Sequence, residues 1–271
     1  MKRFLKTMNL LVLLPVSTLF AQDNQMLENH NLKLGFEFGA NEVGCKLSEH
    51  ERIRKDNRSY NEFLSARSYS LTTMYWGIKP EFFVLNNRMG IASGLRFTKA
   101  TSELSSGMEK FLWKVEEEGF YTNYVQLDKL RQKTYLLTVP FEIRYFLNDR
   151  ELPFQTYVKA GMSVNYRIRS ENHVNFWNSA MESNKDLVQS QLSDNDNFFS
   201  SFAFGAIGFK IGKFREESPM PWVNVEFQFP YILLTNNSFS FVKRGVDGLA
   251  GFGFQLFFQI PIGENVPIGS N

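Results

Sequence analysis

Apolar and polar residues alternate with a period of two over several long stretches of this sequence. In residues 136–146, "LLTVPFEIRYF", one set of alternate positions is apolar, whereas the other set includes Pro140, Glu142 and Arg144. Such alternation is typical of a β-strand, because successive side chains of a strand point to opposite faces. What the protein can do therefore depends on which face of these strands meets water.

The alternating pattern recurs often enough to predict eight antiparallel strands. They are expected at residues 32–40, 69–85, 89–97, 135–147, 153–170, 198–213, 222–234 and 248–260. The gaps between them are alternately long and short. Long loops are expected at residues 41–68, 98–133, 171–197 and 236–246. The alternation is blurred in residues 198–213, which indicates a bend or bulge near Gly205 or Gly208.

The charged residues indicate that these strands are arranged inside out. A lone Lys or Arg that faces lipid at mid-depth costs about 2–4 kcal/mol, whereas charges of both signs that face a barrel lumen can pair. The predicted strands also exceed the usual globular length of about 5–6 residues and suit the roughly 9–11 residues of a membrane strand. The sequence therefore predicts an all-β fold, an eight-stranded antiparallel transmembrane up-and-down β-barrel with long extracellular loops. Its lumen is expected to hold a charge network of Lys33, Glu37, Lys79, Glu81, Arg96, Glu142, Arg144, Lys159, Arg167 and Glu226.

A barrel of this size is narrow, and side chains just fill its interior. We therefore expect a plugged, rigid lumen and no diffusion pore. Pro140 has no backbone N–H for the strand ladder, so it is expected at a bulge or a strained point.

The start of the sequence predicts export to the cell envelope. Residues 1–21 begin with three basic residues, continue with an apolar run and end in "LFA", which is the pattern of a secretory signal peptide that is cleaved after Ala21. The mature chain would then start near Gln22. Residues 22–31 are expected as a periplasmic segment, 32–260 as the barrel in the cell outer membrane, and 261–271 as a short C-terminal tail.

Composition narrows the partners that the protein could have. The chain holds 28 Phe, 10 Tyr and 4 Trp, and its formal net charge is only +2, so no nucleic-acid partner is expected. Cys45 is the one cysteine of the sequence, which excludes an intramolecular disulfide and a cysteine-type zinc site. Outer-membrane lipid is the expected surrounding of what we predict to be a monomer.

Several of these stretches are similar to the PorT-like outer-membrane β-barrel family of Gram-negative bacteria. The resemblance lies in "LFAQ", "LKLGFEFGA", "IKPEFFVLNNRMGIASGLRF", "YLLTVPFEIRYFL", "YVKAGMSVNY" and the glycine-aromatic pattern of the last strand. It covers most of the chain after the leader but not the long loops. The resemblance implies an outer-membrane barrel, and the founding member of that family is linked to a protein-secretion apparatus.

The sequence contains little that would support catalysis. Its three histidines are His30, His50 and His173, and only His173 has a serine and a carboxylate nearby, at Ser170 and Glu171. Neighbours in sequence rarely form a nucleophile–base–acid triad, and no G-x-S-x-G element is present. We therefore expect no catalytic, cofactor-binding or metal site, no cofactor and no enzymatic activity.

The second long gap contains aromatic residues interleaved with charges, and the third adds another. They predict short amphipathic helices that cover the mouth of the barrel, a loop patch that binds a partner, or packing of the loop residues against one another. The candidate patch is Phe111, Trp113, Tyr121, Tyr124 and Trp177.

These observations favour an integral outer-membrane barrel with a structural or interaction role. An accessory role in protein secretion or envelope assembly, with an envelope or secretion-system protein as partner, is the form of that hypothesis we carry forward. The alternatives are a small-solute outer-membrane channel, a lipid-active barrel enzyme that would need His173, and a soluble calyx whose lumen would have to be apolar.

Overall fold

The computed structural model of the protein describes residues 32–47, 53–55, 69–85, 88–105, 111–118, 121–148, 154–192, 197–212, 222–235, 239, 242–244 and 251–261. The predicted signal peptide, the segment 22–31 and nearly all of the predicted tail lie outside the described residues. Within the described ranges, no helix is long and apolar enough to cross a membrane.

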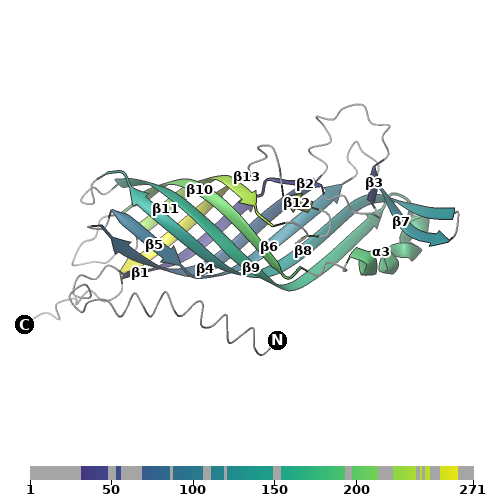
Figure 1. Ribbon diagram of the computed structural model, residues 1–271, viewed down its shortest axis with the longest axis horizontal. Coiled ribbons are helices and arrows are strands. Elements are labelled where there is room, and N and C mark those ends of the chain that lie inside the picture. Colours follow the sequence, from purple (N-terminus) through teal and green to yellow (C-terminus); the bar gives the residue numbers. More distant parts are fainter. Residues whose placement is uncertain are drawn as a thin grey trace, which may run out of the picture.

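One antiparallel β-sheet closes on itself and forms a barrel (Figure 1). Its strands, in chain order, are β1 (Leu32–Glu42), β4 (Tyr69–Val84), β5 (Met89–Ser93), β6 (Leu95–Ser105), β8 (Tyr121–Phe146), β9 (Phe154–Phe176), β10 (Phe199–Ile211), β11 (Trp222–Leu233) and β13 (Gly251–Pro261). β5 and β6 follow one another between β4 and β8 and both pair with these two strands. Each of the other strands pairs with its neighbours in chain order, and β13 pairs with β1 to close the ring. The predicted all-β antiparallel barrel is confirmed.

The interruption between β5 and β6 lies at Gly94, directly opposite Pro140 of β8. Ser93 is the partner of Phe141 and Arg96 is the partner of Thr138, so the register is the same on both sides of the gap. The expectation that Pro140 lies at a bulge is wrong, because the missing N–H interrupts the ladder without shifting it. The shift in this part of β8 is at Tyr135, towards β9.

The bulge expected near Gly205 is confirmed. The pairing of β10 with β11 changes register between Phe204 and Ala206, where Phe229 and Pro230 of β11 lie across from the single residue Gly205. The same two residues also shift the pairing of β11 with β13. Since Pro230 cannot donate to the ladder, it is this proline that lies in a bulge.

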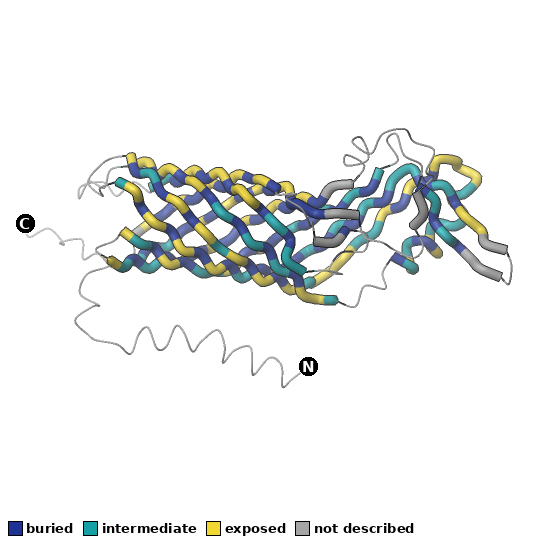
Figure 2. The backbone as a smooth tube through the Cα atoms, turned by 45° about the horizontal axis from the view of Figure 1, so that its top comes forward, coloured by how far each residue is buried: buried dark blue, intermediate teal, exposed yellow. Residues whose placement is uncertain are grey.

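Side chains of the barrel strands alternate between a buried inner face and an exposed outer face (Figure 2). The outer face is apolar: Trp76 is 60% exposed, whereas Lys79, on the inner face of the same strand, is 0% exposed. We call the outward apolar side chains the apolar belt. Its members include Phe36, Phe38, Met74, Trp76, Ile78, Leu95, Phe97, Leu137, Phe141, Ile143, Met162, Val164, Ile207, Phe227, Phe254 and Leu256. Such a wall suits lipid, with the polar side chains turned inward.

The height of the apolar belt can be followed along β8. From Tyr145 to Tyr135 every outward residue is apolar or aromatic, and the next outward residue is Lys133. Ten residue steps of about 3.3 Å, at a tilt of about 40°, rise by roughly 25 Å, which is the height of the apolar band of outer-membrane barrels. The belt therefore ends at Tyr135.

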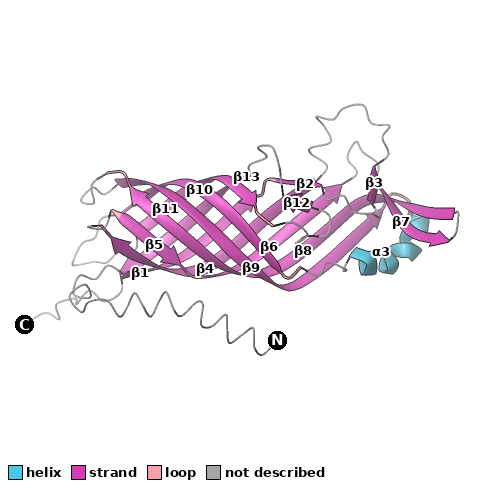
Figure 3. Cartoon of the chain, in the orientation of Figure 1, coloured by secondary structure: helices cyan, strands magenta, loops and turns pink. Residues whose placement is uncertain are grey.

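The barrel wall continues far beyond the belt at the end opposite Leu32 and Pro261, which we call the far end. β8 has 26 residues and β9 has 23, and β7 (Phe111–Glu118) forms a hairpin with the start of β8. The short strands β2 (Cys45–Leu47), β3 (Ile53–Lys55) and β12 (Val242–Arg244) also lie there. So do the 3-10 helix η1 (Ser179–Asn184) and the helix α3 (Lys185–Leu192) (Figure 3).

The expectation of a loop across residues 98–133 is therefore wrong, and the described residues of this segment are strand and not helix. Beyond the belt, Lys99, Thr101 and Glu103 point outward while Ala100 and Leu104 point inward. The alternation persists, but its outward residues are polar because they no longer face lipid. A search for apolar outward faces does not recognise such a strand.

Candidate functional site

The interior of the barrel at the level of the apolar belt holds a set of buried, paired charges. We call it the ionic network, and it comprises Glu37 on β1, Lys79 and Glu81 on β4, Arg96 on β6, Glu142 and Arg144 on β8, Lys159 on β9 and Glu226 on β11. Four carboxylates face four cations, so the network is formally neutral. All eight residues were predicted to face the lumen, and the structure brings them together.

Glu142 on β8 pairs with cations from three other strands. It pairs with Lys79 at 2.6 Å, with Lys159 at 3.3 Å and with the guanidinium of Arg96. Lys79 and Arg96 both reach Glu37 as well, at 3.1 Å and 2.9 Å. A buried carboxylate is stable in its charged form only when such partners compensate for lost hydration. These contacts tie β1, β4, β6, β8 and β9 together through the lumen.

A second part of the network surrounds Glu226. Its carboxylate pairs with Lys159 and with Arg144 at 3.3 Å, and it accepts a hydrogen bond from the hydroxyl of Tyr157 at 2.9 Å. Arg144 also lies 3.4 Å from Glu81 and donates to Asn224 at 3.1 Å. The charges on β4, β8, β9 and β11 are thereby linked around the other side of the lumen.

Aromatic rings also point into the lumen, where they contact the cations. Phe257 is fully buried beneath Lys79, whose Nζ lies 4.2 Å from the ring centroid. Arg96 lies over Tyr75 at 4.7 Å and Arg144 over Tyr157 at 4.3 Å. Cation–π contacts of this kind are worth more where water is excluded. The lumen is thus filled by paired charges and rings.

Lys33, which was also predicted to face the lumen, is the partner of Glu81 on β4 and lies over an aromatic ring. Its Nζ is 3.7 Å from the ring centroid of Trp222, and Lys210 approaches the same ring at 4.2 Å. Both lysines are buried. Lys33, Lys210 and Trp222 together close the end of the barrel at which β1 begins and β13 ends.

Arg167, the remaining residue that was predicted to face the lumen, lies on β9 opposite the buried Leu136 of β8. It is half-buried, and its guanidinium lies 4.8 Å from the ring centroid of Phe198, an exposed residue just before β10. The register of β9 shifts at this point, since Tyr135 pairs with Arg169 but Leu136 pairs with Arg167. Strict alternation along β9 therefore fails between Arg167 and Arg169.

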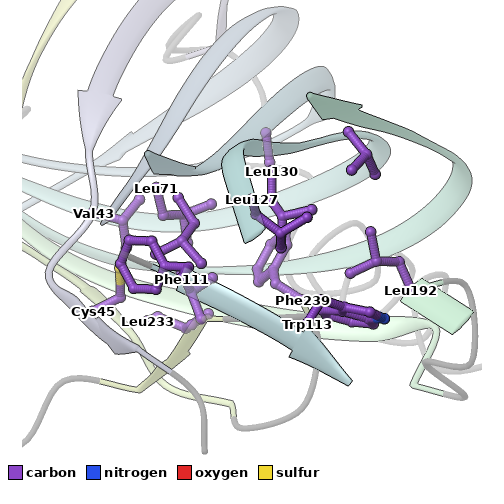
Figure 4. Close-up of a cluster of buried hydrophobic side chains, with 14 of the residues drawn as sticks. Val43, Cys45, Leu71, Phe111, Trp113, Leu127, Leu130, Leu192, Leu233 and Phe239 are labelled. Carbon is purple, nitrogen blue, oxygen red and sulfur yellow. The ribbon is translucent and has the colours of Figure 1, made fainter. Parts of the chain in front are cut away.

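Above the ionic network, the interior holds buried polar side chains such as Thr98, Thr138 and Asn165, together with apolar ones. A continuous cluster of buried side chains runs from the upper barrel into the extension, and ten of its members are labelled in Figure 4. We call it the far-end core; its members include Val43, Cys45, Leu71, Leu104, Phe111, Trp113, Leu127, Leu130, Val174, Val188, Leu192, Phe202, Leu233 and Phe239. The indole N–H of Trp113 donates to Gln191 at 2.8 Å, which attaches α3 to β7.

The predicted loop patch is divided by the structure. Phe111 is 1% and Trp113 is 0% exposed, so both belong to the far-end core and neither is available to a partner, which corrects that part of the prediction. Tyr124 is 38% and Trp177 is 63% exposed. The side chain of Tyr121 lies outside the described residues. The alternation of the β7–β8 hairpin explains the split, because neighbouring residues point to opposite faces.

The residues that sequence reasoning missed are inward-facing polar and aromatic groups. Tyr75, Tyr157, Lys210 and Phe257 all contact the predicted charges or line the same lumen. The aromatic residues among them were missed because rings were assigned to lipid. The period of two could have identified them, because their positions alternate with those of outward residues.

No described group of His, Cys, Asp or Glu side chains has the arrangement of a metal site. His173 is exposed on the outer face of β9, opposite Arg131. His30 and His50 lie outside the described residues.

A closed antiparallel barrel with an apolar outer wall and paired charges in its lumen defines an integral membrane β-barrel protein. The chain belongs to the outer membrane protein beta-barrel domain family, whose sequence model matches residues 20–239. Family membership places the protein in the outer membrane. The match ends before β13, which closes the ring.

Two further comparisons add little. No curated protein matches the sequence. One solved structure with detectable similarity is the outer-membrane expressed OmpT of Vibrio cholerae, at 9% sequence identity, with 84% of this chain and 96% of that chain covered and a TM-score of 0.17. A similarity this low carries no argument about fold or function.

Proposed function

We propose that this protein is a PorT-like outer-membrane barrel with a structural or interaction role, an accessory of protein secretion or envelope assembly. It would act as a non-enzymatic monomer, inserted after removal of a signal peptide that ends near Ala21. The signal-like pattern of residues 1–21 and the sequence resemblance described above support this assignment.

The observation that carries the proposal is the filled interior. The ionic network, the inward rings and the far-end core follow one another along the lumen, so that the described side chains occupy it with paired and packed groups. Opening a path for solutes would expose buried charges and apolar side chains together, which is costly. A channel is therefore disfavoured. The outer surface of the far end is the part of the protein that could bind a partner.

The interaction surface that we propose is the pair Tyr124 and Trp177. The N–H of Trp177 donates to the carbonyl of Gln126 at 3.2 Å, which places Trp177 beside β8 two residues from Tyr124. Both side chains are exposed beyond the apolar belt, where lipid does not explain them. Exposed aromatic residues at such positions are common at protein interfaces.

Complementation of a deletion strain tests this proposal. The double variant Tyr124→Ala/Trp177→Ala should restore a folded barrel to the outer membrane but not normal secretion or envelope integrity. Tyr145→Ala, which removes an exposed tyrosine from the belt, is the matched control and should behave as the unmodified chain. Full complementation by the double variant would remove the interaction role.

Planar-bilayer recordings on the purified chain test the main alternative. We expect no stepwise conductance. Defined single-channel steps would overturn the structural role and favour a small-solute channel.

A further inference from the structure

The outer face of the extension carries basic residues immediately beyond the apolar belt. We call this set the basic face; it comprises Lys99 on β6, Lys129, Arg131 and Lys133 on β8, and Arg169 and His173 on β9. The strands β6, β8 and β9 are neighbours, so these residues lie side by side on one surface. An open pocket of about 240 Å³ lies there, lined by Lys129, Arg131, Lys133, His173 and Asn175.

Ion pairs preorganise part of the basic face. Glu103 lies 2.6 Å from Lys129 and 2.7 Å from Arg131, so one carboxylate holds two cations beside the pocket. Partial burial would raise the pKa of Glu103, but the hydrogen bonds and charges of these two cations outweigh it and hold the pKa below its usual value. The carboxylate therefore stays ionised and keeps both side chains in place.

Positive charge nevertheless remains in excess on this surface. Arg169 pairs with Glu171 at 3.1 Å, and Asp128 adds a third carboxylate next to Lys129. Five cations, without His173, thus stand against three carboxylates. None of the described residues forms an ion pair with Lys133, which lines the pocket. An anion bound in the pocket would accept charge-assisted hydrogen bonds from Lys133 and Arg131.

The height of the basic face indicates the source of that anion. Lys133 is the first outward residue of β8 after Tyr135, where the apolar belt ends, and Arg169 is the partner of Tyr135 on β9. Acyl chains that pack against Leu137 and Tyr166 would bring their headgroup to the level of these cations. The basic face directly adjoins the apolar belt, which suits a lipid that has both acyl chains and a charged headgroup. A protein ligand would not require that the two surfaces adjoin.

We propose that the basic face binds the phosphate groups of a phosphorylated saccharide lipid in the outer leaflet. The inference requires the orientation usual for outer-membrane barrels, in which both termini are periplasmic and the far end faces outward. Guanidinium and ammonium groups bind phosphate through charge-assisted hydrogen bonds, with Arg131 suited to bidentate contact. This lipid contact is independent of the partner proposed for Tyr124 and Trp177.

Binding of defined lipids to the purified chain in a neutral detergent tests the proposal. The probes are diphosphoryl lipid A, its dephosphorylated form and inorganic phosphate, and native mass spectrometry reports the bound fraction. We expect the diphosphoryl lipid to bind about tenfold or more tightly than the dephosphorylated lipid, since one charge-assisted hydrogen bond is worth roughly that ratio. Inorganic phosphate alone should show no retained binding.

Three variants of Arg131 and Lys133 connect the binding to these residues. Arg131→Ala/Lys133→Ala should weaken binding of the diphosphoryl lipid about tenfold or more. Lys133→Ala alone breaks no described ion pair and should also weaken it, whereas Lys133→Arg should retain it. Lys185→Ala removes an exposed far-end lysine that pairs with Glu182 and is the matched control, with unchanged binding expected. A compact band on unheated electrophoresis verifies that each variant is folded.

Three outcomes would overturn the proposal. One is equal binding of the phosphorylated and dephosphorylated lipids. Another is unchanged binding by the folded variant Lys133→Ala together with the folded double variant. The third is tight binding of inorganic phosphate that displaces the lipid, which would show a free-anion site instead.

Discussion

The ring of Phe257 on β13 occupies the space beside Gly35 on β1, where any side chain larger than hydrogen would overlap it. The two strands are paired so that Phe36 lies opposite Phe258 and Glu37 opposite Phe257. Phe257 is fully buried and supports Lys79 of the ionic network. Glycine is therefore required at position 35 because the inward ring of Phe257 occupies the space of a side chain. Gly39 makes room for Tyr75 in the same way.

Enlarging Gly35 should destabilise the barrel. Gly35→Val would push Phe257 away from Lys79, and overpacking of this kind costs about 1–3 kcal/mol or more. The midpoint of urea unfolding, followed by the loss of the compact band on unheated electrophoresis, measures the effect. Ala40→Val adds volume on the outward face of the same strand and should leave the midpoint nearly unchanged. Equal midpoints for the two variants would contradict the assigned role of Gly35.

Neutralising the central carboxylate should cost more. Glu142→Gln leaves Lys79, Arg96 and Lys159 with less compensation in a buried site, and removal of one partner of a buried ion pair costs about 3–5 kcal/mol. The same unfolding assay measures this loss. Glu42→Gln, an exposed carboxylate on β1, is the control and should change stability by less than about 0.5 kcal/mol. A stable Glu142→Gln variant would show that the network is dispensable.

The position of the apolar belt predicts a dependence on depth. Phe141→Arg places a charge in the middle of the lipid-facing wall and should cost about 2–4 kcal/mol, whereas Tyr135→Arg at the edge should cost about 0–1 kcal/mol. Folding into lipid vesicles at several urea concentrations gives both values. If the two substitutions cost the same, the belt does not end at Tyr135.

The thiol of Cys45 should be protected in the folded protein. Burial in the far-end core, assisted by the nearby charge of Glu42, raises the pKa of this thiol to about 12. At pH 8 only about one molecule in ten thousand would carry the reactive thiolate. Alkylation by iodoacetamide, followed by mass spectrometry, should be at least about a hundredfold slower in the folded chain than in urea. Rapid labelling of the folded chain would contradict the burial of this residue.

The barrel strands could be predicted from sequence because alternation is local and the residue types report the solvent on each face. Apolar residues such as Phe141 and Ile143 mark contact with lipid, and Glu142 and Arg144 between them mark the lumen. The prediction of residues 98–133 was wrong for the same reason. Beyond the belt the outer face meets water, so Lys99 and Glu103 on that face resemble a loop although the strand continues.

By itself, the sequence determined the class of fold and the face to which each belt residue belongs, since both follow from a period of two and the cost of charge in lipid. Only the tertiary structure decided which groups meet inside. The contact of Glu37 with Gln255 joins residues that are 218 positions apart, and it exists because β13 closes the ring against β1. Register, bulges and closure are non-local, so the partners of Glu142, the ring over Gly35 and the level of Lys133 above the lipid emerge only once the whole barrel has formed.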